Sequence, residues 1–249
     1  MELHALKLPL IKPGADIAEM IFEHSKRIGG LKNEDIAVIS SKIISVARGN
    51  LVKLSDVSPS KRAKRISSRI KRPPEFVEVV LQEADKVLGF SHGVILTLKQ
   101  GLLCANAGVD TSNAPPGYVV LMPRNPDLEA EEIRRRLRKL SGAAVGVVIS
   151  DSNVKPMRVG TVGQAIGVAG LPPVLDCRGE PDLYGKPLRQ TFRAVADQLA
   201  SAAQLLMGEG NERTPVVVVR GLSLPKVRHK LSPKMAPKQD MYSKILRLK

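Results

Sequence analysis

Three apolar runs of this chain end in short segments of acidic and small polar residues. These segments are found in GLLCANAGVDTSN (101–113), VGVVISDSN (145–153) and GVAGLPPVLDCRGEPDLYGKPL (167–188). Asp110 and Asp151 each follow an apolar run directly. A carboxylate at the end of a buried strand suits a ligand site better than it suits a core. We therefore expect the two acids to serve a shared metal–phosphate site.

The size and composition of the chain predict a folded protein. Its 249 residues are 43% hydrophobic, which is enough to bury a substantial core. No apolar run approaches the roughly 20 residues of a membrane-spanning helix. The first residues, MELHALKLPLIKPG, lack the basic start and unbroken apolar stretch of a signal peptide. We expect a cytoplasmic location and no membrane contact. The two cysteines, Cys104 and Cys177, are far apart in the sequence, and we expect both to be free thiols that serve packing.

The formal net charge of +15 is spread unevenly along the chain. One basic cluster is SKRAKRISSRIKRPPE (60–75), and the other is the segment that follows Gly221. Aromatic residues make up 3% of the chain and do not interleave with either cluster, so the stacking platforms of single-strand nucleic-acid binders are missing. This disfavours nucleic-acid binding as the primary function. A basic surface also suits a small polyanionic substrate.

Apolar periodicity predicts a mixture of helices and strands. We expect helices at about 16–27, with Asp16 as the cap, over 75–88, at 127–142 and from Pro187 to Met207. Many charges of the basic cluster at 60–75 should line a solvated helical face. We expect strands within 35–47, where a buried run leads into a polar turn, and within 93–108, 117–123, 143–150 and 215–221. The hairpin in 93–108 should turn at Gln100-Gly101. Residues 1–221 are predicted to form one domain, with a basic C-terminal tail at 222–249.

Phosphate binding would have to rely on unusual loops in this chain. No GxxxxGK[ST] loop is present and no GxGxxG follows a strand, which excludes the Walker and Rossmann devices. NAGVDTSN (106–113) and GEGNERT (208–214) offer backbone N–H groups that could hold phosphate. Loops of this composition are most often plain turns, however.

The two carboxylates carry more information as a pair. If Asp110 and Asp151 lie close together, they repel each other unless a cation neutralises them. Mg²⁺ and Mn²⁺ prefer such oxygen ligands. Ser152 adds a hydroxyl group, and Glu209 could complete a second metal site. Taken separately, each acid could equally cap a helix or a turn, and the sequence alone leaves open whether they converge.

Four motifs of the chain resemble the coenzyme F420-0:L-glutamate ligase family. They are LPLI (8–11), CANAGVDTSN (104–113), AIGVAGLPPVLDCRGEPDLYGKPL (165–188) and LLMGEGNERTP (205–215), within a likeness that spans about 8–221. The resemblance implies metal ligands at Asp110, Asp151, Ser152 and Glu209, with the two aspartates also catalytic. It implies nucleotide contacts from Leu8, Pro9, Leu10, Ile11, Ser40, Ser41, Lys42, Asn113, Met207, Gly208, Gly210, Asn211 and Glu212.

The resemblance also implies a fold and a reaction. The fold would be a family-specific α+β arrangement forming an intertwined homodimer, with active sites near the subunit interface. GTP would phosphorylate the terminal carboxylate of the deazaflavin F420-0, and L-glutamate would attack the acyl phosphate. Two divalent ions, Mg²⁺ or Mn²⁺, would take part, with K⁺ as a further candidate.

Some residues depart from the family pattern. Val46 replaces a lysine, Lys99-Gln100 replaces Arg-His, Arg124 replaces an acid, VKPMR (154–158) replaces GRPWR, and Glu209 replaces a glutamine. Two alternatives therefore stay open beside F420-0 ligation. One is a ligase of the same fold that acts on a different carboxylate. The other is a non-enzymatic homologue that associates with nucleic acid through its basic tail. The choice between GTP and ATP also stays open.

Overall fold

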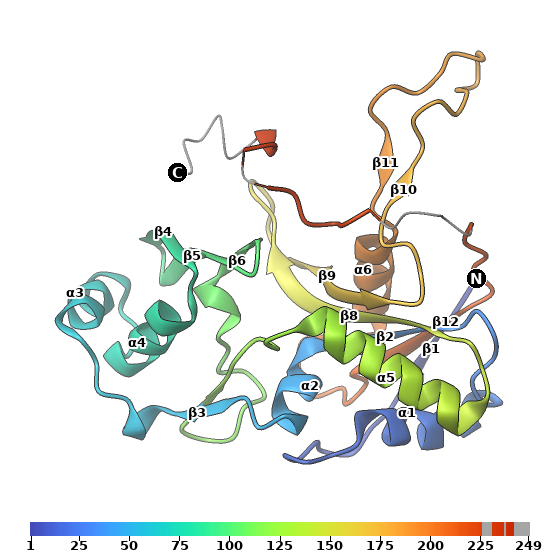
Figure 1. Cartoon of the computed structure of the whole chain (residues 1–249). Coiled ribbons are helices and arrows are strands. Elements are labelled where there is room, and N and C mark those ends of the chain that lie inside the picture. The colour runs from blue at the N-terminus through green and yellow to red at the C-terminus, as the bar shows by residue number, and fades with distance from the viewer. Residues whose placement is uncertain (226–230, 237, 242–249) are drawn as a thin grey trace.

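The protein has a mixed α+β fold that consists of a sheet-centred body, a smaller lobe and a projecting arm (Figure 1). The computed structural model describes residues 1–225, 231–236 and 238–241. Among these residues, no helix is both long and apolar enough to cross a membrane. The expected α+β class is confirmed.

The body is built on a five-stranded sheet with the order β1-β12-β2-β8-β9. Its strands β2 and β8 run parallel, and the other neighbours are antiparallel. The strands are β1 (Glu2–Leu6), β2 (Ile36–Ser40), β8 (Gly146–Val154), β9 (Thr161–Ala169) and β12 (Val216–Arg220).

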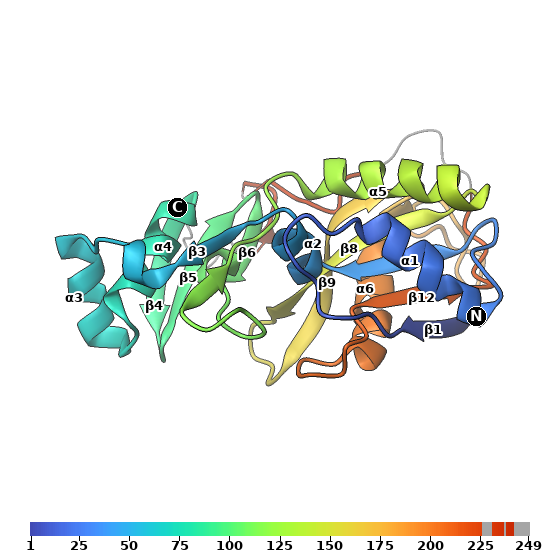
Figure 2. The same cartoon turned by 90° about the horizontal axis from the view of Figure 1, so that it is seen from below.

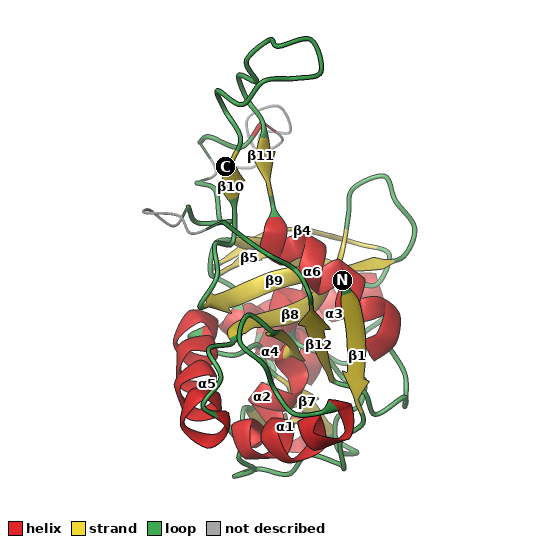
Figure 3. Ribbon diagram, turned by 90° about the vertical axis from the view of Figure 1, so that its right-hand side faces the viewer, coloured by secondary structure: helices red, strands yellow, loops and turns green. Residues whose placement is uncertain are grey.

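Helices cover both faces of this sheet, as Figures 1 and 3 show. One face packs against α1 (Ile17–Ser25), α2 (Ser41–Ala47) and α5 (Pro126–Ser141), and the other packs against α6 (Val195–Met207). Alternate residues of the apolar strands face opposite layers; Ile39 belongs to the first core and Val38 to the second. Burial on both faces explains why β2, β8 and β12 read as continuous apolar runs.

The lobe is formed by residues between α2 and α5, and it lies at one end of the elongated molecule (Figure 2). It has its own apolar core, which the residues of α3 and α4 share with Ile95 and Val119. Its elements are β3 (Leu51–Lys53), α3 (Lys61–Ile70), α4 (Pro74–Glu83), β4 (Lys86–Ser91), β5 (Val94–Lys99), β6 (Leu102–Ala105) and β7 (Tyr118–Val120), with 3-10 turns at Leu54–Asp56 and Asn106–Gly108.

The arm is a hairpin that projects away from the body (Figures 1 and 3). Its two short strands are β10 (Leu175–Asp176) and β11 (Phe192–Arg193). Leu183 is 100% exposed and Tyr184 is 87% exposed in the segment between them. Large apolar side chains without neighbours are typical of a surface that another chain covers.

Several local predictions are confirmed. Asp16 caps α1 by accepting a hydrogen bond from the Glu19 amide, and a 3-10 turn (Lys26–Ile28) extends this helix. Strands β5 and β6 are joined at Gln100 and Gly101, both of which have positive φ. That conformation matches the twist of a tight hairpin. The basic cluster at 60–75 places its charges on the exposed side of α3, while Ala63, Ile66 and Ile70 are buried.

Three element predictions are wrong. The polar turn expected after β2 is the helix α2, because Ile43, Ile44 and Ala47 are spaced to bury one helical face. The helix expected over 75–88 ends at Glu83 and is followed by β4. The helix expected from Pro187 begins only at Val195, because residues 187–193 belong to the arm.

The predicted C-terminal tail lies only partly within the described residues. Leu222 and Leu224 are partly buried and pack against the core beside α6. Residues 226–230, 237 and 242–249, which make up half of the predicted basic tail, lie outside the described part of the chain.

Candidate active site

The parallel pairing of β2 and β8 determines the location of the candidate site. Ser40 is paired with Ser150, so the residues that follow in each strand emerge at the same end of the sheet. The chain passes from β2 straight into α2, which puts Ser41 and Lys42 in the first turn of the helix. Ser41 Oγ donates a hydrogen bond of 2.7 Å to Asp151 Oδ1. Ser41 and Asp151 are 110 positions apart in the sequence, and they thus meet at the carboxyl end of β2.

Asp110 reaches the same place from the lobe. Its backbone forms an isolated bridge with Val120 just after the 3-10 turn at Asn106–Gly108. Lys42 Nζ lies 2.6 Å from Asp110 Oδ2 and 2.8 Å from both the carbonyl oxygen and the hydroxyl of Ser112. Asp110 and Asp151 are near enough to influence each other's ionisation. The convergence that the sequence left open is therefore present, with a lysine beside the acids.

The two carboxylates have opposite pKa shifts. Burial raises the pKa of Asp151, and the negative charge of Asp110 adds to this; the Ser41 hydrogen bond and the charge of Lys42 oppose it. Burial also opposes ionisation of Asp110, but hydrogen bonds from Lys42 and Ser112 outweigh it and lower the pKa of that group. The ionised form of Asp110 is thus stabilised by its neighbours, whereas the ionised form of Asp151 lacks a positive charge in direct contact.

Ser152 and Glu209 form a second cluster on the opposite face of β8. Ser152 is paired with Gly163, where an added Cβ would collide with the backbone of α6, so this face looks toward α6. Asp151, one residue earlier, points to the other face. Glu209 Oε1 accepts hydrogen bonds from Ser152 Oγ at 2.8 Å, from Thr161 Oγ1 at 2.9 Å and from Gln204 Nε2.

The four predicted metal ligands are therefore divided into two sets. Asp110 and Asp151 form one, and Ser152 and Glu209 form the other. Asp151 does not end its strand as predicted, because β8 continues to Val154 beyond a register shift at Ile149/Ser150. The polar residues after the apolar run keep pairing with β9, since a ladder requires backbone groups rather than apolar side chains.

The predicted nucleotide loops meet beside the first set. Asn113 Nδ2 donates to the carbonyl of Gly210 at 3.0 Å, and the Leu8 amide donates to the carbonyl of Arg213 at 2.9 Å. The Ser40 amide donates to Pro215 at 2.8 Å, and Glu212 accepts from the Gly210 amide at 2.9 Å. These bonds connect segments that are far apart in the chain, namely 8–11, 40–42, 110–113 and 207–215.

The predicted nucleotide residues differ in exposure. Leu8 is buried in the core, and Leu10 is 77% exposed. Ile11, Lys42, Met207 and Gly208 are partly exposed. Pro9, Asn113, Gly210, Asn211 and Glu212 are exposed, whereas Ser41 is buried against Asp151 and Ser40 is partly buried. The Leu8 side chain therefore serves packing, and an incoming ligand would meet the neighbouring backbone and the exposed loop residues.

Sequence reasoning missed Ser112, Thr161 and Gln204. The contact of Ser112 could have been predicted, because an aspartate side chain often accepts a hydrogen bond from the backbone amide two residues later. Here the Ser112 amide donates to Asp110 Oδ1 at 2.8 Å. Thr161 and Gln204 reach Glu209 only because β9 and α6 pack beside β8. No local pattern indicates that arrangement.

The departures from the family pattern lie in different places. Val46 is one helical turn after Lys42 on α2, so its side chain lies next to that lysine. Gln100 donates to the carbonyl of Pro123, and Arg124 is exposed. Residues 154–158 lie at the turn between β8 and β9, where Met157 is fully exposed.

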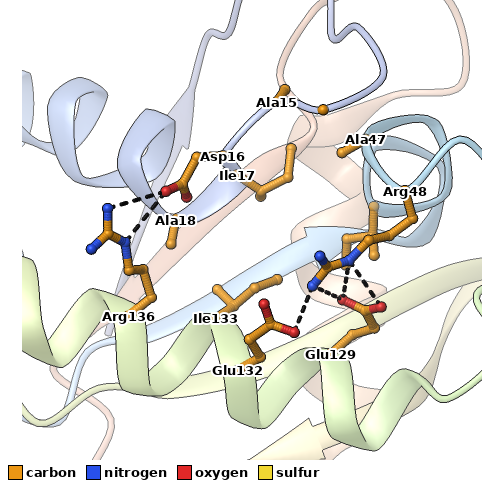
Figure 4. Close-up of a pocket in the computed structure, with 12 residues that line it drawn as sticks. Ala15, Asp16, Ile17, Ala18, Ala47, Arg48, Glu129, Glu132, Ile133 and Arg136 are labelled. Atoms are coloured by element: carbon orange, nitrogen blue, oxygen red, sulfur yellow. Dashed lines mark hydrogen bonds and ion pairs between the residues drawn. The ribbon is translucent and has the colours of Figure 1, made fainter.

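A cavity of about 340 Å³ lies between α1, α2 and α5, away from these residues (Figure 4). Its charged groups pair with each other: Arg48 contacts Glu129 and Glu132, and Arg136 contacts Asp16. The hydrogen bonds that Arg48 donates to Glu132 and Glu129 raise the pKa of its guanidinium group. These ion pairs join α1 and α2 to α5, so the charged groups around the cavity hold the helices together. None of the predicted site residues lines it.

The chemistry of the first set suits a hard divalent cation. Within the described residues, no group of three Asp, Glu, His or Cys side chains is gathered to hold a metal by itself. The protein offers two carboxylates and hydroxyl oxygens on one face of β8, and one carboxylate with hydroxyls on the other. Mg²⁺ characteristically binds through one or two carboxylates and completes its ligands with water and substrate phosphates.

Comparison with known proteins agrees with the motifs of this site. The family model described as F420-0:Gamma-glutamyl ligase matches residues 5–221, and the chain belongs to that family. The chain is 45% identical over 217 residues to the Coenzyme F420:L-glutamate ligase of Archaeoglobus fulgidus, covering 87% of this chain and 86% of the relative. It is 43% identical over 239 residues to the protein of that name from Methanopyrus kandleri, covering 93% of each.

Proposed function

We propose that the protein is a nucleotide- and metal-dependent ligase that joins L-glutamate to the carboxylate of coenzyme F420-0. The observation that carries this proposal is the meeting of Asp110, Asp151 and Lys42 where β2 ends alongside β8, near the loops at 8–11 and 207–213. That arrangement pairs metal-binding oxygens with a cation and loop amides that suit a triphosphate. The names of the relatives support the choice of F420-0 and glutamate.

The reaction would proceed in two displacements. An oxygen of the F420-0 carboxylate attacks the γ-phosphorus of GTP, forming a C–O–P bond while the bond to the β-phosphate oxygen breaks and GDP leaves. The glutamate amine then attacks the acyl carbon, an amide C–N bond forms, and inorganic phosphate leaves as the amine loses its proton. No protein nucleophile is required, so the protein contributes positioning and charge.

Each part of the site would have a distinct task. Asp110 and Asp151 would hold one divalent ion, and Ser152 with Glu209 would hold a second; when bound, these ions neutralise phosphate charge. Lys42 would offer an ammonium to a phosphate oxygen, and the exposed loop at 209–213 would offer backbone N–H groups, although that of Gly210 already donates to Glu212. The Asn113 bond to Gly210 fixes that loop against the Asp110 segment. The strongly positive net charge would attract the anionic substrates.

The arm supports assembly as a homodimer. Leu183 and Tyr184 are almost fully exposed on the arm, and Met157 and Val159 are fully exposed on the β8–β9 turn. A second copy of the chain could cover these apolar groups in a symmetric, self-complementary contact. Light scattering should give a dimer mass, and Leu183→Asp with Tyr184→Asp should reduce it to a monomer. A wild-type monomer at micromolar concentration would contradict the dimer.

A direct assay tests the ligase proposal. Purified protein is incubated with F420-0, L-glutamate, GTP or ATP, and Mn²⁺ or Mg²⁺, with and without K⁺, and the products are identified by mass spectrometry. A glutamyl adduct that requires both nucleotide and divalent ion supports the proposal. If no glutamyl adduct of F420-0 forms, but a different carboxylate is converted to its amide with release of GDP, the result would favour the related ligase with a different substrate. Absence of any amide product would contradict both.

A further inference from the structure

Lys42 places its ammonium group directly against the Asp110 carboxylate. Its ammonium group donates to Asp110 Oδ2 at 2.6 Å, to the Ser112 carbonyl at 2.8 Å and to Ser112 Oγ at 2.8 Å. An ammonium has three N–H bonds, and all three are used here. The side chain is only 24% exposed, so this is a well-held contact rather than a solvated surface pair.

The Asp110 carboxylate is correspondingly satisfied by its own chain. Oδ1 accepts from the Ser112 amide at 2.8 Å, and Oδ2 accepts from Ser112 Oγ at 2.7 Å as well as from Lys42. Asp151 differs, because its contacts are the Ser41 hydroxyl and the backbone of its own neighbour, and Lys42 acts on it only through space. One lysine therefore supplies the nearby positive charge for two carboxylates.

We propose that Lys42 is an exchangeable counter-ion, which holds Asp110 until a nucleotide phosphate takes the ammonium over and leaves the carboxylate to a divalent cation. This inference rests on the proposed function. Two cations cannot share one carboxylate oxygen without strong repulsion, so the ammonium and the metal compete for Asp110. A phosphate oxygen gives the ammonium an equivalent charge-assisted partner. Nucleotide and metal then favour each other's binding through one side chain.

The position of Lys42 makes this exchange feasible. It lies in the first turn of α2, next to the loops at 110–113 and 207–213, so its flexible stem can turn from one acceptor to another without moving the helix. Ser41, its neighbour, remains bonded to Asp151 in the meantime. Metal binding before the nucleotide arrives would require displacement of this partly exposed ion pair, in which the Lys42 side chain is 24% exposed and the Asp110 side chain is 46% exposed. The order in which the ligands bind is thereby biased.

Two separate binding measurements on the full chain test the inference. Mn²⁺ affinity is measured without nucleotide by electron paramagnetic resonance of the free ion, and GTP affinity is measured in EDTA by isothermal titration calorimetry. Keeping the ligands apart avoids the complex that Mn²⁺ and GTP form in solution. Lys42→Met removes the ammonium and keeps the length of the side chain. It should raise the affinity for Mn²⁺ alone about tenfold or more and lower the affinity for GTP alone by a similar factor.

A matched control separates competition from general charge. Lys99 acts on Cys104 through space, as Asp151 does, and pairs with Glu83 rather than with Asp110. Lys99→Met removes the same charge from the neighbourhood and should change the affinity for Mn²⁺ by less than about threefold. Lys42→Arg, which keeps the charge, should bind Mn²⁺ as weakly as the wild type does.

The outcomes distinguish this inference from the proposed function. Opposite shifts in Lys42→Met, with Lys99→Met unchanged, support the exchange. If the affinity of Lys42→Met for Mn²⁺ is unchanged or weaker while Asp110→Asn abolishes binding, the metal site stands and the exchange is overturned. If both lysine variants gain Mn²⁺ affinity equally, the effect is general charge and the exchange is again overturned. Absence of Mn²⁺ binding in the wild type and in every variant would overturn the metal site and this inference together.

Discussion

The two faces of β8 carry two differently balanced polar clusters. On one face, Asp110 and Asp151 share a lysine, and burial disfavours ionisation of Asp151. On the other face, Glu209 is surrounded by the hydroxyls of Ser152 and Thr161 and the amide of Gln204, and no described basic side chain forms an ion pair with it. The first cluster thus contains a cation of its own, whereas the described partners of Glu209 in the second cluster are neutral groups. Substitutions in the two clusters should therefore differ in kind.

The largest effect is expected in the first cluster. Asp110→Asn and Asp151→Asn should each lower turnover by roughly two orders of magnitude or more, because each removes a charge from a site that handles a triphosphate. The fold should persist, since asparagine keeps the size of aspartate and its side-chain oxygen can still accept a hydrogen bond from Ser41 or Lys42. Steady-state kinetics and far-UV circular dichroism check the two statements. Near-normal turnover of either variant at limiting metal would contradict the two-carboxylate site.

A smaller gain is expected from Val46→Lys. Val46 lies one helical turn after Lys42, so a lysine there would add a second ammonium beside the first. GTP binding should tighten by up to about tenfold, and added salt should diminish the gain. Calorimetry at two salt concentrations measures it, with Val46→Met as the uncharged control. Equal affinities for the two variants would show that α2 does not face the phosphates at this position.

A substitution in the second cluster should change the metal requirement of the reaction rather than the affinity for the nucleotide. Glu209→Gln keeps the hydrogen-bonding geometry and removes one negative charge, so the metal concentration for half-maximal activity should rise several-fold, roughly in line with the loss of one carboxylate ligand. The affinity for GTP in EDTA should stay the same. An unchanged metal requirement would place the second ion elsewhere or remove it from the proposal.

The local sequence predicted the helices, strands and turns of this molecule better than it predicted the tertiary contacts between them. Asp16 as a helix cap, the hairpin turn at Gln100-Gly101 and the last strand each depend on neighbours within a few residues. The approach of Ser41 to Asp151 depends on the parallel pairing of β2 with β8, which a run of apolar residues does not encode.

The failures have the same origin. Helix α2 was missed because seven residues are too few for a clear period once serines interrupt them. Gln204 was missed because it contacts Glu209 only when α6 packs on β9. The family motifs pointed to Asp110 and Asp151 as site residues, which stays a prediction, and the structure shows that Lys42 joins Asp110 to α2.

The opposite pKa shifts of the two aspartates predict opposite effects on stability in metal-free protein. The pKa of Asp151 is raised in the folded state, so its ionisation destabilises the fold as pH rises from the unfolded value through the folded one. The pKa of Asp110 is lowered, so it stabilises the fold above its unfolded pKa, and this contribution is lost as pH falls through the folded value.

Thermal unfolding in EDTA measures this contrast. At neutral pH, Asp151→Asn should raise Tm and Asp110→Asn should lower it, each by about a few degrees. At about pH 3 to 4, where the carboxylates gain protons, the differences should shrink. The same sign for both variants at neutral pH would mean that the two carboxylates do not differ in charge balance as the structure indicates.

The smallest effect is expected from the tail, whose Leu222 and Leu224 contact the α6 side of the sheet. Leu222 and Leu224 pack against the core formed with α6, so truncation after Gly221 exposes apolar surface there. Truncation should lower Tm by about a few degrees. It should leave turnover within about twofold of the full chain, because the described tail residues form no hydrogen bond to the site residues. Truncation after Pro225, which keeps both leucines, is the matched control and should restore Tm. Complete loss of turnover in a folded protein truncated after Pro225 would show that the basic tail takes part in the reaction.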